Sequence, residues 1–209
     1  MSALNKIAYF QNRRDEAPNQ ALAQELAETK NKKGIQEIAE NLEHKNPSVQ
    51  SDCLKVLYEI GYLDPGLIAD YVDEFLKLLK SKNNRMVWGS MIALATIATL
   101  KPREIWKHVD DVTSALDHGT LITVVWGLKA LARVASTNRQ YHEKLFPILI
   151  KHLKSCIPRD VPTHAESILC AVDRRHKDEF LSVLESRRTE MTASQLARLR
   201  QVTRQLDAR

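Results

Sequence analysis

Apolar residues recur at helical spacing along most of the chain. Within residues 71–79, the side chains of Val72, Phe75 and Leu79 fall on one face of a helix, as expected for an amphipathic segment. A short polar stretch follows, and residues 85–100 are then apolar nearly all round. A helix of that kind must be covered on both flanks by neighbours. The pattern therefore predicts helical hairpins that cover one another.

The same helix, turn, helix pattern occurs in three other segments. Capping residues help to place the helix ends in the first of them: Asn46 suits an N-cap, Pro47 a first-turn position and Gly61 a C-cap. The predicted helix pairs are 35–42 with 49–60, 109–116 with 121–135, and 145–153 with 163–172.

A sequence repeat supports this division. Val87-Trp88-Gly89 returns 38 residues later as Val125-Trp126-Gly127, a period typical of stacked helical hairpins. Because Gly costs roughly 1 kcal/mol against Ala inside a helix, two glycines at matched positions predict a close backbone approach between helices. Steps of 38 residues from these glycines reach small residues in the outer units, namely Ser51 and Ala165.

The repeats resemble HEAT repeats. Residues 145–149 followed by Leu153 are similar to that family's first-helix pattern, and residues 46–49 followed by Leu57 to its turn and second helix. The resemblance covers residues 34–175 and implies an all-α, right-handed α-solenoid of about four to five hairpins with helical caps at both ends. HEAT repeats usually carry Arg after the Val of the second helix. Here that position holds Gln50, Trp88, Trp126 and His164, which puts in doubt the arginine ladder that such solenoids often build.

The two ends differ from the middle, as capping units should. Amphipathic helices are predicted over 3–13 and 18–30, and Thr192 with Gln195 forms a capping-box pattern for a last helix. The expected boundaries are N-terminal capping helices over 1–33, four repeats over 34–65, 66–102, 103–137 and 138–175, and C-terminal capping helices over 176–209.

The composition, 44% hydrophobic and 27% charged, is that of a soluble globular protein. Three cysteines without Cys-x-x-Cys spacing argue against a disulfide framework and favour a reducing compartment. No secretory signal is visible at the N-terminus, and the uncharged segment 86–100 is too short to span a membrane. We therefore expect a cytoplasmic protein that does not enter a membrane.

No catalytic constellation is recognisable. The chain has no Gly-rich phosphate loop, no His-Glu-x-x-His and no Gly-x-Ser-x-Gly, and its seven histidines lack metal-ligand spacing. We therefore predict no catalytic, cofactor or metal site, no small-molecule substrate and no enzyme activity.

The tryptophans of the repeat are the candidates for a binding surface. In HEAT solenoids the second helices line the concave face, so aromatic rings interleaved with cations there would suit a phosphate backbone or an acidic peptide. The alternative is that both rings are core wedges with the cations extending past them. Different parts of the repeat align at 38 or at 37 residues, so the sequence does not decide which face of the helix carries Lys129. The candidate surface comprises Trp88, Met91, Trp126, Lys129, Arg133 and His164.

Positive charge concentrates at the C-terminal end. Residues 174–209 hold nine basic and five acidic side chains, against a net charge of +5 for the whole chain. One interpretation is a positively charged surface that binds nucleic acid or an acidic protein. The other is a solvated capping helix. The candidate basic patch comprises Arg187, Arg188, Arg198, Arg200 and Arg204.

Two functions fit these features. The favoured one is a non-enzymatic scaffold whose concave helical surface binds a protein partner. The alternative is a DNA-binding protein that resembles the HEAT-like alkylpurine glycosylases and uses a basic, aromatic groove. That family needs a catalytic carboxylate, whereas Asp110 and Asp111 lie on the other helix of the hairpin. Nucleic acid is therefore the less favoured partner.

Overall fold

The computed structural model describes residues 2–208 and is all-α: it has twelve α-helices, short 3-10 helices between them, and no strand in that range. The chain forms two compact units, one up to Gly127 and one from Leu128. None of the helices in the described range is long and apolar enough to cross a membrane.

The first unit carries the helices α1 (Ala17–Glu28), α2 (Lys32–Glu40), α3 (Pro47–Leu63), α4 (Val72–Leu78), α5 (Asn84–Ile97), α6 (Pro102–Lys107) and α7 (Val109–His118). Helix α8 (Leu121–Ala135) begins in this unit and ends in the second. The second unit continues with α9 (Arg139–Ser155), α10 (Val161–Ile168), α11 (Lys177–Ser186) and α12 (Ala193–Asp207).

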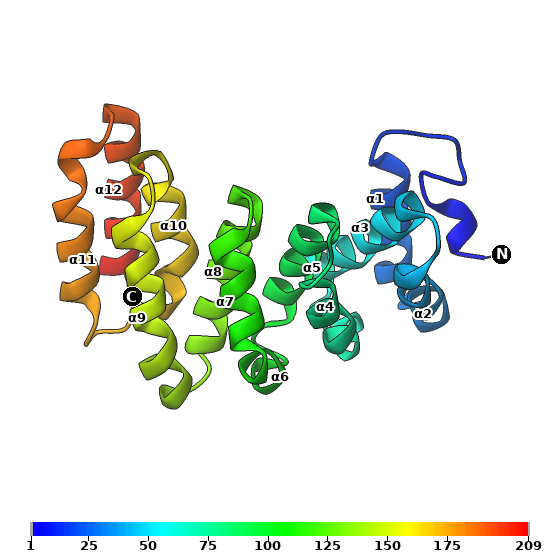
Figure 1. Ribbon diagram of the computed structural model, residues 1–209, viewed down its shortest axis with the longest axis horizontal. Helices are drawn as coiled ribbons and strands as arrows, with labels where there is room; N and C mark the ends of the chain where they lie inside the picture. Colours follow the sequence, from blue (N-terminus) through cyan, green and yellow to red (C-terminus); the bar gives the residue numbers. More distant parts are fainter. Residues whose placement is uncertain (1, 209) are drawn as a thin grey trace. The chain divides into compact units, whose positions relative to one another are not determined.

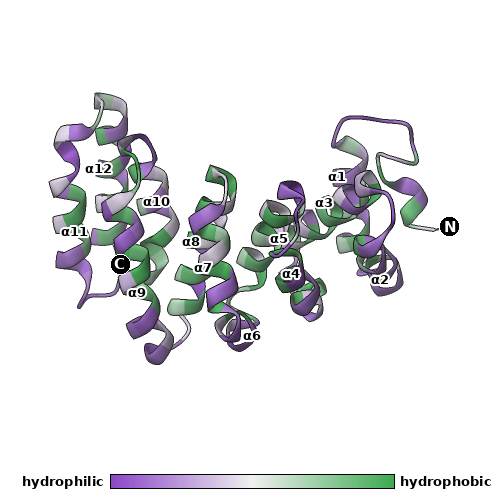
Figure 2. Cartoon of the chain, viewed as in Figure 1, coloured by the Kyte–Doolittle hydropathy of each residue, from purple (hydrophilic) through white to green (hydrophobic). Residues whose placement is uncertain are grey.

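Within each unit, corresponding helices of successive hairpins pack on one another (Figure 1). Helix α3 lies between α1 and α5, while α4 packs against both α5 and α6. In the second unit α9 packs against α10 and α11, and α10 packs against α12. This is the stacking that the apolar pattern predicts. Hydrophobic and hydrophilic residues alternate along helices such as α9 and α11 (Figure 2), as the amphipathic spacing requires.

The second helix of the middle hairpin is buried almost throughout. All residues of α5 from Gly89 to Ile97 are buried, as expected for a segment that has no polar face. Its neighbours α3 and α4 supply the cover that such a helix needs.

Leucine side chains from neighbouring helices pack directly against the two repeated glycines. A Cβ atom on Gly89 would lie 2.6 Å from Leu54 Cδ2, and one on Gly127 would lie 2.6 Å from Leu116 Cδ2. A Cβ at either position would force the leucine to move, so the helices are closely packed there. The predicted approach of a backbone is nevertheless wrong. The approaching group is a leucine side chain of α3 or α7 rather than a backbone.

Most predicted caps are confirmed, with one exception. Asn46 accepts a hydrogen bond from Ser48 N ahead of Pro47, and Thr192 forms the full capping box with Gln195. The prediction that Gly61 ends its helix is wrong, because α3 continues to Leu63. Gly61 instead gives room to α5: a Cβ there would lie 2.4 Å from Thr96 Oγ1.

The helix predicted over residues 3–13 is also wrong. This segment forms a single 3-10 turn, Leu4–Lys6, followed by further turns. Two of its backbone N–H groups donate to side chains that are distant in the sequence: Ala8 N donates to Asn19 Oδ1, and Tyr9 N donates to Asp52 Oδ2. These bonds fix the segment on α1 and α3 in place of the helical i to i−4 pattern.

Candidate functional site

Four aromatic side chains form a continuous row across the second helices of the first unit. Tyr58 and Tyr62 of α3 lie with ring centroids 6.0 Å apart. Tyr58 is 6.2 Å from Trp88 of α5, and Tyr62 is 5.6 Å from Trp126 of α8. All three contacts are tilted or edge-on, the arrangements that aromatic pairs prefer. We call this row the aromatic ladder.

The ladder is anchored at one point and open elsewhere. Tyr58 is 5% exposed, whereas Tyr62, one helical turn later, is 46% exposed. Trp88 and Trp126 are half-buried. The rings are therefore packed between helices on one side and accessible from the other. They combine the two alternatives that the sequence left open, core wedge and exposed surface.

Two cations lie on the ladder, and carboxylates balance them. Lys55 Nζ is 5.0 Å from the Tyr58 ring centroid, and the Arg85 guanidinium is 6.0 Å from that of Trp88. Lys55 bonds Glu16 at 2.7 Å and Glu59 at 2.6 Å, and Glu16 also lies 3.7 Å from Arg85.

These contacts keep Lys55 charged although its side chain is only 8% exposed. Burial favours loss of its proton, but the bonds to Glu16 and Glu59 outweigh burial and raise the pKa of Lys55. At Tyr62, burial is the main cause of a raised pKa, so this hydroxyl stays neutral. The ladder thus presents neutral rings beside a balanced charge network.

Two residues of the predicted surface are not accessible. Met91 is fully buried in α5, where its sulfur lies beside Gly127. His164 of α10 is 3% exposed. Neither side chain can contact a partner in this structure, so the assignment of both to an exposed surface is wrong. The repeat register places His164 on the second helix of its hairpin but does not report the packing around that position.

Lys129 and Arg133 belong to the second unit, where both are half-buried. Burial and the nearby Arg133 charge lower the pKa of Lys129, while Glu166 opposes that shift. Their participation in a binding surface stays a prediction.

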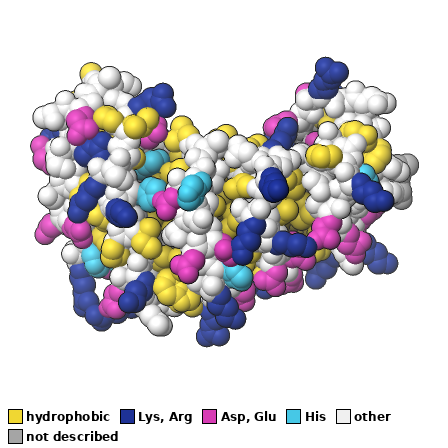
Figure 3. All heavy atoms as spheres, in the orientation of Figure 1, with side chains coloured by type: hydrophobic (Ala, Val, Ile, Leu, Met, Phe, Trp, Pro, Cys, Tyr) yellow, Lys and Arg dark blue, Asp and Glu magenta, His cyan; other side chains and the backbone are white. Residues whose placement is uncertain are grey.

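The basic patch is reduced by burial and by pairing with acids. Arg187 is buried, so its assignment to an exposed patch is wrong: its guanidinium donates to main-chain carbonyls at the end of α9 and to Glu190. Arg188 pairs with Glu185 at 2.9 Å and Arg198 with Glu166 at 2.6 Å. On the face drawn in Figure 3, basic and acidic side chains are interspersed over this unit.

Besides the paired Arg188, the exposed residues of the patch are Arg200 and Arg204 of α12. They line a cavity between α11 and α12 together with apolar residues such as Leu181 and Leu196 and the acid Asp178. Binding of a partner there stays a prediction.

Sequence reasoning missed both tyrosines of the ladder. They lie eight and twelve residues after Gln50, which occupies the tryptophan position of the first repeat. Neither tyrosine lies on the face of Gln50, because at about 100° per residue these steps turn the helix about 80° and 120° away from it. Their contacts with Trp88 and Trp126 join positions 30 and 64 residues apart, which the single repeat period did not reveal.

Comparison with known proteins defines the fold. No protein-family model and no curated protein sequence matches the chain. An engineered protein of known structure matches with a TM-score of 0.63 and 18% identity over 100% of this chain and 98% of its own. A designed armadillo repeat protein in complex with the peptide (KR)4 matches with a TM-score of 0.66 and 14% identity over 88% of this chain and 85% of its own.

A natural match is Kap121p, with a TM-score of 0.64 and 18% identity. It covers 96% of this chain, which spans only 22% of Kap121p. These likenesses confirm the predicted resemblance and fold class: an all-α armadillo/HEAT-like repeat fold. They give no support to the alternative of a DNA-binding, alkylpurine-glycosylase-like protein.

Proposed function

We propose that this chain is a non-enzymatic binding scaffold for a protein partner, and that the aromatic ladder contacts an extended peptide segment of that partner. The observation that carries the proposal is the ladder itself, in which half-exposed rings from three successive hairpins lie in one row. Interfaces concentrate binding energy in Trp, Tyr and Arg side chains. The ladder with Arg85 contains all three types.

The ladder is also held in place before any partner arrives. Buried Tyr58 fixes the row between helices, and Lys55 is locked by two carboxylates. Less side-chain freedom is lost on binding when the anchor residues are already ordered. Similar solved structures support a peptide as partner, since one of them is a designed armadillo repeat protein bound to a peptide and another was designed for modular peptide recognition.

The charge balance at the ladder favours a peptide over nucleic acid. Lys55 and Arg85 are both within ion-pair distance of Glu16, so neither is left to neutralise a phosphate. Binding to a phosphate backbone relies on such neutralisation. A peptide that inserts apolar or aromatic side chains between the rings needs no net charge.

The test is a selection of peptides from a random display library on the intact chain. Peptides selected on the original protein are measured against Tyr62→Ala and against Phe10→Ala. Phe10 is the matched control, because it is 43% exposed in the same unit but lies outside the ladder. Loss of a central aromatic contact costs about 1–2 kcal/mol, which is about 5- to 30-fold in affinity.

We expect that loss for Tyr62→Ala and a change within about twofold for Phe10→Ala. Circular dichroism of each variant checks that the helices are intact. Failure to enrich any peptide, or equal losses in the two variants, would contradict the proposal.

A further inference from the structure

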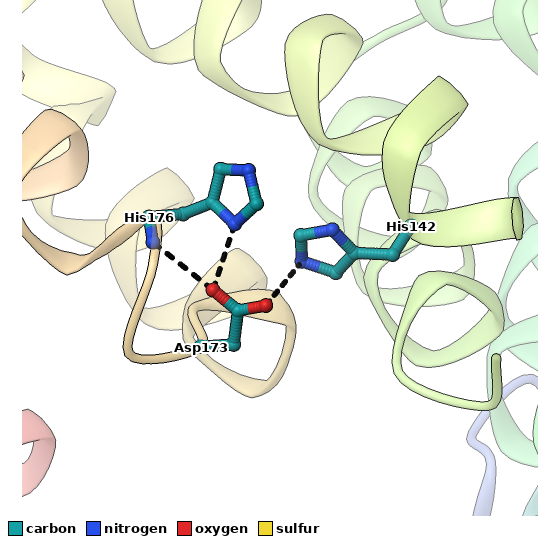
Figure 4. A group of neighbouring side chains, drawn as sticks. All are labelled: His142, Asp173 and His176. Carbon is teal, nitrogen blue, oxygen red and sulfur yellow. Dashed lines mark hydrogen bonds and ion pairs between the residues drawn. The ribbon is translucent and has the colours of Figure 1, made fainter. Parts of the chain in front are cut away.

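In the second unit, two histidines face one carboxylate. His142 lies in the first turns of α9, Asp173 in the loop after α10, and His176 immediately before α11. His176 Nδ1 is 2.7 Å from Asp173 Oδ1, and His142 Nε2 is 3.9 Å from Asp173 Oδ2. Figure 4 shows both rings directed at the two carboxylate oxygens. One nitrogen from each ring and a carboxylate oxygen all lie within 4.8 Å of one another.

The surrounding structure holds these groups in position. The His142 ring stacks on Phe146 at 5.1 Å, and its Nε2 donates to the Ala171 carbonyl at 2.7 Å. Asp173 Oδ1 accepts the backbone N–H groups of Arg175 and His176, each at 3.0 Å. The carboxylate is thus oriented by its own loop, as outer contacts orient the ligands of metal sites.

The group is open to solvent on one side. The three side chains line a cavity of about 380 Å³ between α9 and the loop that leads to α11. His142 is buried at its wall, whereas the side chains of Asp173 and His176 are 49% and 31% exposed. An ion can therefore enter from solvent and keep a water molecule as a further ligand.

We propose that His142, Asp173 and His176 bind a divalent transition-metal ion, with Zn²⁺ as the best match. Two imidazoles and one carboxylate are donors that suit Zn²⁺, whereas Ca²⁺ and Mg²⁺ require mostly oxygen ligands. Zinc sites with three protein ligands leave the fourth position to water.

The distances are close to those a bound ion needs. Zinc-to-ligand bonds of about 2.0–2.2 Å place neighbouring ligand atoms of a tetrahedral site about 3.4 Å apart. The two observed separations, 2.7 Å from His176 to Asp173 Oδ1 and 3.9 Å from His142 to Asp173 Oδ2, lie on either side of that value. One donor atom from each residue lies within 4.8 Å of the others, so side-chain rotations must bring the three donors onto one ion. For Nε2 of His142 to bind the ion, the ring proton that it now donates to Ala171 moves to Nδ1, and the hydrogen bond to Ala171 is given up.

Charges around the cavity set the strength of binding. Arg139 and Arg175 also line it and oppose a cation. Arg139 is paired with Glu143 at 2.8 Å, so its charge is compensated. We therefore expect moderate affinity, and we expect the ion to tie α9 to the start of α11 and raise the melting temperature of the chain.

The test uses the full chain without a histidine tag. Zn²⁺ binding is measured by calorimetry, and Co²⁺ serves as a spectroscopic probe because its visible absorption reports nitrogen ligation and low coordination number. The variants are His176→Gln and Asp173→Asn, which change partly exposed side chains.

The matched control is His108→Gln. His108 lies 3.2 Å from Asp111 with the same spacing of three residues, but Lys80 Nζ, at 3.0 Å from that carboxylate, takes the place of the second histidine. Circular dichroism without metal confirms that each variant is folded.

We expect one ion per chain, a Co²⁺ spectrum typical of nitrogen ligation, at least tenfold weaker Zn²⁺ binding in both site variants, and a change within twofold in the control. Absence of saturable Zn²⁺ binding to the original chain overturns the proposal. Zn²⁺ binding that is unchanged in His176→Gln and Asp173→Asn also overturns the proposal, since the ion would then be held elsewhere.

Discussion

Arg187 is expected to be a main determinant of stability in the second unit, in contrast to its neighbour Arg188. Its guanidinium donates to the carbonyls of Leu153, Lys154 and Cys156 at 3.1, 2.6 and 2.7 Å. These carbonyls lie at the C-terminal end of α9, where no helical donor remains and a positive charge is favourable.

The magnitude follows from these contacts. Hydrogen bonds to a charged group contribute about 1.5–3 kcal/mol each. Water can replace part of this contribution at the exposed Lys154 but not at the buried Leu153. We therefore expect Arg187→Ala to lower the free energy of unfolding by about 3 kcal/mol. Among residues 2–208, Arg188 has only an exposed ion pair with Glu185, for which about 0–1 kcal/mol is typical.

Urea unfolding followed by far-ultraviolet circular dichroism measures both variants. With a slope of about 2–3 kcal/mol per molar urea, Arg187→Ala should lower the midpoint by about 1 M or more. Arg187→Lys separates charge from geometry, since a single ammonium cannot reach all three carbonyls and should recover only part of the loss. Equal midpoints for Arg187→Ala and Arg188→Ala would refute the assignment of Arg187 as the cap of α9.

Two further substitutions test the packing. In Gly89→Ala, the better helix propensity of Ala, about 1 kcal/mol, is outweighed by overpacking of about 1–3 kcal/mol against Leu54. Urea unfolding should therefore show a net loss of stability, and this loss should shrink when Leu54 is also replaced by Ala. A gain of stability would contradict the close contact. For His164→Leu, stability at pH 7 should rise by about 1 kcal/mol, because neither ring nitrogen of His164 has a hydrogen-bond partner among residues 2–208. Burial lowers the pKa of His164 below its ordinary value of 6.5, so the unfolded chain binds the proton more readily and stability falls as the pH drops below roughly 6.5. Denaturant midpoints of His164→Leu across this range should lose part of that acid sensitivity, and an unchanged pH profile would refute the reasoning.

The sequence predicts the fold well because local signals and the repeat point to the same hairpins. Asn46 with Pro47 and Thr192 with Gln195 mark helix starts through contacts only two or three residues away. The repeated glycine at position 89 indicated close packing because a mid-helix Gly needs a reason. Such features are visible without knowledge of the tertiary structure.

Where prediction failed, distant residues decided the outcome. The segment 3–13 has a helical apolar pattern, but Asn19 and Asp52 capture its backbone donors. Arg187 lies in a basic stretch of the sequence, but its guanidinium is buried against carbonyls of residues more than 30 positions away.

The histidine pair was missed for the same reason. His142 lies 31 residues before Asp173, so no sequence spacing reveals that the two side chains lie near one another.

The aromatic ladder as a peptide-binding surface is tested most directly by tryptophan fluorescence. Trp106→Phe leaves Trp88 and Trp126, both in the ladder, as the only tryptophans of the chain. Titration of this variant with a selected peptide should change their emission along the same curve as peptide binding measured by fluorescence anisotropy of the labelled peptide. Binding at full affinity without any change in emission would show that the peptide contacts another surface.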